Sequence, residues 1–205
     1  IDNAIISYGG GDSSIEGGSA NFNVIEIHQA EVRITNSLIS DNADGNATGV
    51  RNGRGANAAA TIYVRGAQPI IIGNEIVDNA GPAININANS LQFSNQPDYG
   101  RSTGNLEVFA EFDDNVGPLV RLNQFENNGI NGMLVRGEVL TTESIWDDTD
   151  IVHVLQNEIT VGNHHSNSGL TLRSSGSESL VVKLQGNNAG FTATGTPAEI
   201  IDRIG

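Results

Sequence analysis

The chain has no cysteine, one lysine and only 5% aromatic residues, and these scarcities exclude several classes of protein. Without cysteine there is neither a disulfide framework nor a thiolate zinc site. Ten basic residues against 24 acidic ones give a formal net charge of −14, so the chain lacks the basic face that a nucleic-acid partner requires. No apolar run approaches the roughly 20 residues of a membrane-spanning helix, so we expect no membrane span.

Asn and Gly are abundant instead, with 25 residues of each among 205. The length suits one domain over residues 1–205. The chain has no initiator Met, and its apolar pattern is already running at Ile1, so we expect a piece of a longer polypeptide. An acidic, lysine-poor, cysteine-free composition rich in Asn, Gly, Ser and Thr is typical of an extracellular or cell-surface bacterial protein.

Short β-branched segments recur along the chain and predict strands. Each has four to six residues and is bounded by Gly, Asn, Pro or Asp, and no long window carries a helical period. The predicted strands are Val24–His28, Glu31–Thr35, Thr61–Arg65, Pro69–Ile72, Ala83–Asn87, Leu119–Leu122, Gly132–Arg136, Ile151–Leu155, Gly169–Arg173 and Leu180–Leu184.

The strands occur in sets of three short segments. After Thr61–Arg65 and Pro69–Ile72 comes a third segment, Glu75–Asn79, and Ile84 then restarts the cycle 22 residues after Ile62. This period predicts an all-β solenoid, a parallel β-helix of about six to seven coils stacked at the spacing of neighbouring strands. Residues 9–19, 43–60, 89–112 and 138–146 interrupt the period and are interpreted as loop insertions.

Asn marks the end of the second strand of each set. We interpret four Asn residues as equivalent: Asn36, Asn74, Asn123 and Asn157. A second Asn follows five or six residues later, at Asn42, Asn79, Asn128 and Asn163. Asn tolerates the left-handed backbone of a tight bend, and an Asn repeated in every coil can hydrogen-bond its copy one coil away. These residues are therefore predicted to form a structural Asn ladder.

These segments resemble the right-handed parallel β-helix, or pectin-lyase-like, superfamily over nearly the whole chain. The stretch Glu143–His153 and the later Asn163-His164-His165 are similar to β-helix repeat regions of very large secreted bacterial surface proteins of the planctomycete type. The resemblance implies a right-handed coil and carries over no catalytic residue. In polyuronate lyases of this fold an Arg or Lys acts as the base beside Ca²⁺.

A pair of acidic segments forms a candidate cation site. Phe112-Asp113-Asp114 and Trp146-Asp147-Asp148 align at an offset of 34 residues, each eleven residues before an Asn. If the two blocks lie on neighbouring coils, Asp113 and Asp114 stack over Asp147 and Asp148 with Asp150 nearby, and a bound Ca²⁺ would relieve the repulsion. The alternative is that these Asp residues form ordinary turn hydrogen bonds. No cofactor is required by any motif.

A basic column is the second candidate. Arg65, Arg136 and Arg173 each end the first strand of a set. Stacked guanidinium groups could bind the carboxylates of a polysaccharide, although they could equally pair with outward Glu side chains. Trp146 and Tyr99 could stack on sugar rings, although Trp146 aligns with Phe112 and could instead be an apolar plug of the core. If the chain is an enzyme, Asp147, Asp148, Arg136 and Arg173 are the expected catalytic groups.

The leading functional hypothesis is a non-enzymatic structural or adhesive segment of a large extracellular bacterial protein. Its partners would be further coils of the parent chain or a second copy packed end to end. The alternative is a polysaccharide-binding or polysaccharide-degrading β-helix, a lyase or glycoside hydrolase. The acids repeat along the chain, which favours the structural hypothesis because a catalytic pair is usually singular.

Overall fold

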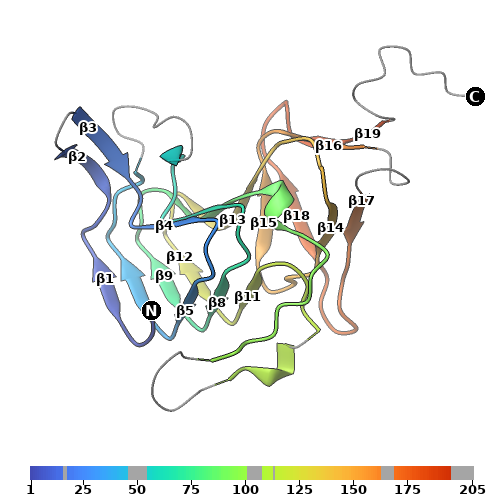
Figure 1. Ribbon diagram of the computed structural model, residues 1–205, viewed down its shortest axis with the longest axis horizontal. Helices are drawn as coiled ribbons and strands as arrows, with labels where there is room; N and C mark the ends of the chain where they lie inside the picture. Colours follow the sequence, from blue (N-terminus) through green and yellow to red (C-terminus); the bar gives the residue numbers. More distant parts are fainter. Residues whose placement is uncertain (16–17, 46–54, 101–107, 113, 163–168, 195–205) are drawn as a thin grey trace, which may run out of the picture.

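The computed structural model describes residues 1–15, 18–45, 55–100, 108–112, 114–162 and 169–194 (Figure 1). The strands are β1 Ile5–Ser7, β2 Gly11–Ile15, β3 Gly18–Phe22, β4 Ile25–His28, β5 Arg33–Thr35, β6 Leu38–Ser40, β7 Ile62–Arg65, β8 Ile70–Ile72, β9 Glu75–Val77, β10 Pro82–Asn87, β11 Leu119–Arg121, β12 Gln124–Glu126, β13 Ile130–Arg136, β14 Glu143–Trp146, β15 Val152–Leu155, β16 Glu158–Val161, β17 Gly169–Leu172, β18 Val181–Leu184 and β19 Gly190–Ala193. Two short 3₁₀ helices, η2 Ala88–Ser90 and η3 Ala110–Phe112, lie between β10 and β11.

The prediction of an all-β chain built from parallel strands is confirmed, and each of the ten predicted strands matches an observed strand to within two residues at each end. From β4 to β13 the chain visits three parallel sheets in rotation. They are a six-stranded sheet ordered β18-β15-β13-β10-β7-β4, a three-stranded sheet ordered β11-β8-β5 and a four-stranded sheet ordered β1-β6-β9-β12. Each passage through the three sheets is called a circuit below, and neighbouring circuits lie side by side in Figure 1.

Alternation along the strands explains how the circuits bury their apolar side chains. In β7, Ile62 and Val64 are fully buried, and they pair in register with Ile84 and Ile86 of β10. The three-stranded sheet adds Ile34, Ile71 and Val120 to the same core. Each apolar residue therefore packs against its equivalent from the neighbouring circuit, and the backbone groups of each inner strand are hydrogen-bonded by the strands on either side.

The regular rotation changes after β13. The three- and four-stranded sheets receive no further strand in the described residues after β11 and β12, and two two-stranded parallel sheets, β14-β17 and β16-β19, take their place. Only the six-stranded sheet continues, through β15 and β18. Within this second region, Trp146, Leu155 and Ile159 extend the apolar core.

One of the predicted loop insertions is a strand pair. Residues 9–19 contain β2 and the start of β3, which form an antiparallel hairpin in which Gly11 lies opposite Phe22. The hairpin projects at the end of the molecule that carries β1 (Figure 1). Among the described residues, no helix has the length and apolar character needed to cross a membrane.

Candidate functional site

Two rows of polar side chains run across the circuits at their bends. At the bend between the three- and four-stranded sheets, the Asn74 side chain accepts a hydrogen bond from the Ser37 backbone N–H at 3.1 Å, and the Asn123 side chain accepts one from the Asn74 amide at 2.9 Å. Asn74 also donates to the carbonyl oxygen of Ile34 at 2.9 Å and is 1% exposed. This row therefore contains Ser37, Asn74 and Asn123.

Asn36 lies one position outside the row in which the sequence alignment placed it. Its backbone φ is +50°, and it matches Gly73 at φ +65° and Leu122 at φ +58° in the neighbouring circuits. Each circuit thus places a left-handed residue at this bend and the row residue directly after it. Asn suits both roles, so the sequence pattern alone does not distinguish them.

Asn157 does not extend the row. It is exposed, and among the described residues neither its side chain nor its backbone makes a hydrogen bond to Asn123. The strand that follows it, β16, pairs with β19 and not with β12. The prediction that Asn157 continues the ladder is wrong because the chain changes sheets after β13.

The second row, at the next bend, contains Asn42, Asn79 and Asn128, linked side chain to side chain at 2.8 Å. Asn163 lies outside the described residues.

The acidic segment 147–150 covers the free edge of β11. The Asp147 carboxylate accepts the Val116 N–H at 3.1 Å, Asp148 accepts the Val120 N–H at 3.1 Å, and Asp150 accepts the Leu122 N–H at 2.6 Å. Asp148 and Asp150 thus replace carbonyls that a further strand alongside β11 would have supplied. The predicted stacking of Asp148 over Asp114 is therefore wrong: Asp148 lies over Val120, six residues further along, and Asp113 lies outside the described residues.

Arg121 and Arg173 neutralise this acidic segment. Arg121 lies 4.0 Å from Asp148 and 3.6 Å from Asp150, and it donates to the carbonyl oxygen of Asp147 at 2.8 Å. Arg173 forms an ion pair with Asp147. Burial raises the pKa of Asp148 well above its usual value, Arg121 opposes the rise and Asp147 adds to it. Burial likewise raises the pKa of Asp147 and of Asp150. The carboxylates are thus held by N–H donors and guanidinium groups.

The arrangement of Asp147, Asp148 and Asp150 around Arg121 and Arg173 does not resemble a calcium site. A Ca²⁺ ion takes six to eight oxygen ligands arranged around it. Among the residues that the structure describes, no three His, Cys, Asp or Glu side chains converge in a way that could hold a metal ion. Asp114 is exposed, and it is its backbone carbonyl that faces Arg173. These Asp carboxylates accept hydrogen bonds from backbone N–H groups, as the alternative of turn hydrogen bonds predicts, and they also cap the edge of β11.

Trp146 is an interior residue, so the suggestion that it stacks on a sugar is wrong. Its side chain is fully buried, lies 5.3 Å from the His153 ring at an interplanar angle of 12°, and donates to the Ser144 hydroxyl at 3.1 Å. His153 occupies the inward position between Met133 of β13 and Val182 of β18. Neither His153 ring nitrogen makes a hydrogen bond of standard geometry. Burial lowers the pKa of His153 to about 4, so the ring is neutral at pH 7.

The outward face of the six-stranded sheet carries most of the predicted basic column. His28 of β4 pairs in register with Arg65 of β7, and Asn87 of β10 lies between Arg65 and Arg136 of β13. Arg173 does not belong to this column, because β17 lies in a different sheet and directs Arg173 to Asp147. The four catalytic candidates are therefore not brought together: Arg136 lies on the six-stranded sheet, while the other three lie beside β11.

Arg136 is largely committed to structural contacts. It donates to the Asn85 side chain at 2.7 Å and to the Val64 carbonyl at 2.8 Å, and its guanidinium lies 4.4 Å from the centre of the Tyr63 ring. Nearby, His28 forms a hydrogen bond with Glu26 at 3.1 Å. Sequence reasoning missed Glu26 and Tyr63, although both stand at outward positions of predicted strands. This cluster of Glu26, His28, Tyr63 and Arg136 is called the outer-sheet cluster below.

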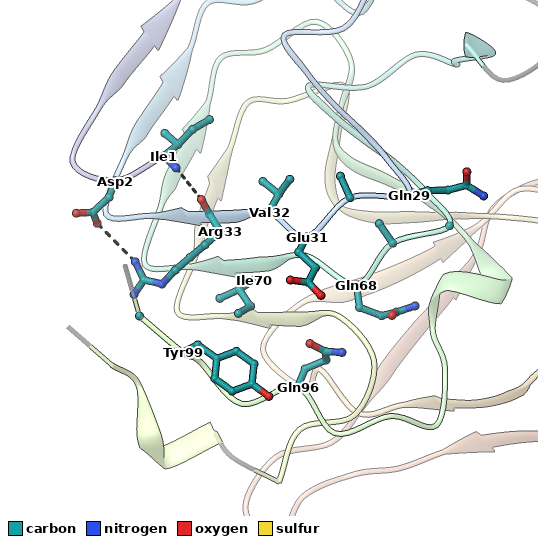
Figure 2. A pocket seen from close by; sticks show the side chains of 14 residues that line it. Ile1, Asp2, Gln29, Glu31, Val32, Arg33, Gln68, Ile70, Gln96 and Tyr99 are labelled. Carbon is teal, nitrogen blue, oxygen red and sulfur yellow. Dashed lines mark hydrogen bonds and ion pairs between the residues drawn. The ribbon is translucent and has the colours of Figure 1, made fainter. Parts of the chain in front are cut away.

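A groove of about 660 Å³ lies beside the bends that precede β5 and β8 (Figure 2). Its lining includes Gln29, Glu31 and Val32 from the first bend, Gln68 from the second bend, Ile70 from β8, and Gln96 and Tyr99 from the insertion after β10. Tyr99 is 76% exposed. The predicted sugar-stacking residue Tyr99 is therefore available to a ligand, in contrast to Trp146.

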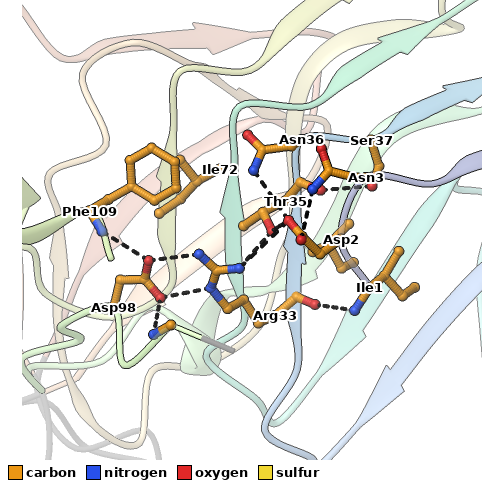
Figure 3. Close-up of polar contacts among 12 residues, drawn as sticks. Ile1, Asp2, Asn3, Arg33, Thr35, Asn36, Ser37, Ile72, Asp98 and Phe109 are labelled. Atoms are coloured by element: carbon orange, nitrogen blue, oxygen red, sulfur yellow. Dashed lines mark hydrogen bonds and ion pairs between the residues drawn. The ribbon is translucent and has the colours of Figure 1, made fainter. Parts of the chain in front are cut away.

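A buried ion pair holds the Tyr99 loop in place (Figure 3). The Asp98 side chain has no exposed surface and accepts two hydrogen bonds from Arg33, at 2.8 and 3.0 Å. It also accepts the N–H groups of Gly100 at 2.9 Å and Phe109 at 3.1 Å. Burial alone would raise the pKa of Asp98, but these hydrogen bonds outweigh it and the pKa lies below its ordinary value. The pair joins β5 to a loop 65 residues away in sequence.

The comparisons with known proteins supply no family. No protein-family model, no curated protein and no solved structure matches the chain.

Proposed function

We propose that the chain is a right-handed parallel β-helix and serves as a rigid structural or adhesive segment of a large extracellular bacterial protein. The observation that carries the proposal is the rotation of the chain through three parallel sheets from β4 to β13. Each circuit buries its apolar side chains against equivalent residues of the next, which is the repeating logic of solenoid proteins.

The polar rows support a mechanical role. Ser37, Asn74 and Asn123 at one bend, and Asn42, Asn79 and Asn128 at the next, tie neighbouring circuits together by side chain as well as by backbone. A chain with no cysteine gains stiffness in this way without disulfides. A composition with a net charge of −14 keeps such a surface soluble and repels polyanions at long range.

A second candidate function is polysaccharide binding or cleavage, and the outer-sheet cluster is the observation that favours it. His28 and Glu26 of β4 are hydrogen-bonded on an outward sheet face, Tyr63 lies in the neighbouring strand β7, and Arg136 of β13 reaches across β10 to the Tyr63 ring. A carboxylate, an imidazole and a guanidinium on one face are groups that bind or protonate sugars. The contacts that Arg136 already makes to Asn85 and Val64 weaken this candidate.

A polysaccharide panel separates the two functions. The 205-residue chain is incubated with neutral and acidic polysaccharides, and both reducing ends and 4,5-unsaturated uronates are measured. The structural proposal expects no product and slow digestion by a non-specific protease under native conditions. Product formation that is lost in His28→Ala but retained in Asp147→Asn would overturn it and assign the chemistry to the outer-sheet cluster.

A further inference from the structure

The groove beside β5 and β8 has a net negative charge. The positive charge of Arg33 is matched by Asp98 at 2.8 Å and by Asp2 at 3.9 Å. Glu31 also lines the groove, is exposed, and has no hydrogen-bond or ion-pair partner among the described residues. The terminal ammonium of Ile1 also lines the groove and donates to the Arg33 carbonyl oxygen at 2.8 Å. Arg33 and Ile1 therefore balance Asp98 and Asp2, and Glu31 carries the charge left over, so an anionic ligand is disfavoured and a cationic one is favoured.

The groove also has an apolar floor and an aromatic wall. Val32 and Ile70 lie along its inner side, and the Tyr99 ring lies across from them with the Glu31 carboxylate directed toward the same space (Figure 2). An aromatic face and a carboxylate together attract an ammonium or guanidinium group, while the apolar floor covers its alkyl stem.

The position of Tyr99 does not follow from core packing. The adjacent Asp98 is fully buried with four hydrogen bonds, whereas the Tyr99 ring remains 76% exposed. The loop is thus held in place at Asp98, and it presents the aromatic side chain of Tyr99 to solvent. Fixing a binding side chain before the ligand arrives reduces the entropy lost on binding.

Three glutamine side chains complete the lining. Gln29, Gln68 and Gln96 come from three different segments, and each amide offers both a donor and an acceptor. A peptide backbone presents donors and acceptors in alternation, which such amides can pair. The volume of about 660 Å³ lies within the range of sites that hold ligands of a few residues.

We propose that this groove binds an extended peptide segment of a partner protein through a lysine or arginine side chain. The cationic head of that side chain lies against Glu31 and Tyr99, its stem lies on Val32 and Ile70, and the glutamine amides pair with the peptide backbone. The proposal goes beyond the structural role above and does not depend on it.

Calorimetric titration of the 205-residue chain with three short peptides tests the proposal. The probes are acetyl-Ala-Lys-Ala-amide, the neutral acetyl-Ala-Gln-Ala-amide and the acidic acetyl-Ala-Glu-Ala-amide. The lysine peptide is expected to bind at least about tenfold more tightly than the other two, with an affinity that falls as salt is added. Equal affinity for the lysine and glutamine peptides would overturn the proposal.

Variants then locate the binding. Glu31→Gln and Tyr99→Ala are each expected to weaken the lysine peptide about tenfold, which corresponds to the loss of one charge pair or one cation–π contact. The matched controls Glu75→Gln and Tyr8→Ala alter an exposed Glu and an exposed Tyr outside the groove and should leave the affinity unchanged. Unchanged affinity in both groove variants, with an unaltered circular dichroism spectrum, would refute the assignment.

A last arm distinguishes a peptide from a cationic sugar. A glucosamine tetrasaccharide carries ammonium groups without a peptide backbone. The proposal expects it to bind more weakly than the lysine peptide. Tighter binding of the tetrasaccharide would contradict the peptide assignment.

Discussion

Two regions of the molecule satisfy the same kind of backbone edge with different chemistry. From β1 to β13, the polar rows at the bends consist of neutral side chains that recur from circuit to circuit, as in the row of Ser37, Asn74 and Asn123. Beyond β13, the edge of β11 is capped by Asp147, Asp148 and Asp150, and their charges are matched by Arg121 and Arg173.

The difference shows what happens where the repeat stops. Inside the repeat, inner strands such as β7, β8 and β9 have a strand on both edges, and an amide can be both donor and acceptor to its copies. At β11 no further strand arrives among the described residues, so carboxylates accept the N–H groups left over. Because these carboxylates are buried, the cap on β11 contains charges that depend on pH, whereas the Ser and Asn rows of the first region contain no group that titrates near pH 7.

The largest expected effect comes from removing an internal row residue. Asn74→Ala leaves the Ser37 N–H and the Ile34 carbonyl without their side-chain partner in a buried site. Two unsatisfied buried groups predict a loss of about 4 kcal/mol in the free energy of unfolding. Urea denaturation measures it. The control Asn157→Ala, at the exposed position that the sequence alignment treats as equivalent, should change stability by less than about 0.5 kcal/mol.

The second prediction concerns acid. The folded-state pKa of His153 is about 4, below the unfolded value of about 6.5, so the unfolded chain binds the proton more readily. The stability that His153 contributes is present above pH 6.5 and is lost as the pH falls to 4, by about 3 kcal/mol. The raised pKa values of Asp147, Asp148 and Asp150 act in the opposite sense, since protonated carboxyls favour the folded state at low pH.

The difference between wild type and His153→Phe isolates the histidine. Unfolding free energies at pH 7 and pH 4 should show the variant losing about 3 kcal/mol less than the wild type over this interval. Phe keeps an aromatic ring against Trp146 at 5.3 Å spacing and removes the titration. Parallel pH profiles for the two proteins would contradict the lowered folded-state pKa of His153.

Asp148→Asn sharpens the comparison by giving the second region the chemistry of the first. The amide keeps an acceptor for the Val120 N–H but removes a fully buried charge whose pKa is raised. Relative to wild type, the variant should gain about 1 kcal/mol at pH 8 and less at pH 5, because the wild-type carboxyl is stabilised by protonation as the pH falls. Thermal unfolding at the two pH values checks this. A loss of stability that is larger at pH 8 would show that the ion pair with Arg121 is the dominant interaction.

The smallest effect is a gain at the bend before β12. Leu122 has φ +58° where the equivalent residues are Asn36 and Gly73, and its side chain is 54% exposed. A left-handed conformation costs a non-glycine residue about 1 kcal/mol, so Leu122→Gly should stabilise the chain by up to that amount. Leu122→Val, which tolerates this conformation less well, should destabilise it. Equal stability of the two variants would remove the argument from backbone strain.

Sequence reasoning predicted the regular part of the fold because the repeat itself encodes it. Strands such as Thr61–Arg65 were predicted from alternation, and the observed β7 spans Ile62–Arg65. The off-by-one placement of Asn36 arose because Asn suits both the left-handed bend and the position after it. An alignment cannot distinguish the two without the strand register.

The rest depends on how segments distant in sequence dock. The similarity of Phe112-Asp113-Asp114 to Trp146-Asp147-Asp148 is real in sequence, but Asp148 lies over Val120 because β14 and the segment after it leave the earlier sheets. The Tyr99 groove depends on the Arg33–Asp98 pair across 65 residues, for which no local pattern exists.

Cross-linking of cysteine pairs tests the central claim about register most directly, since the natural chain contains no cysteine. Glu75 and Gln124 are exposed and pair in register between β9 and β12. The double variant Glu75→Cys/Gln124→Cys should be joined by a short bifunctional thiol reagent. Gln124→Cys/Glu158→Cys, the pair that the 34-residue alignment places together, should not. Cross-linking of the second pair in preference to the first would contradict the change of sheets after β13.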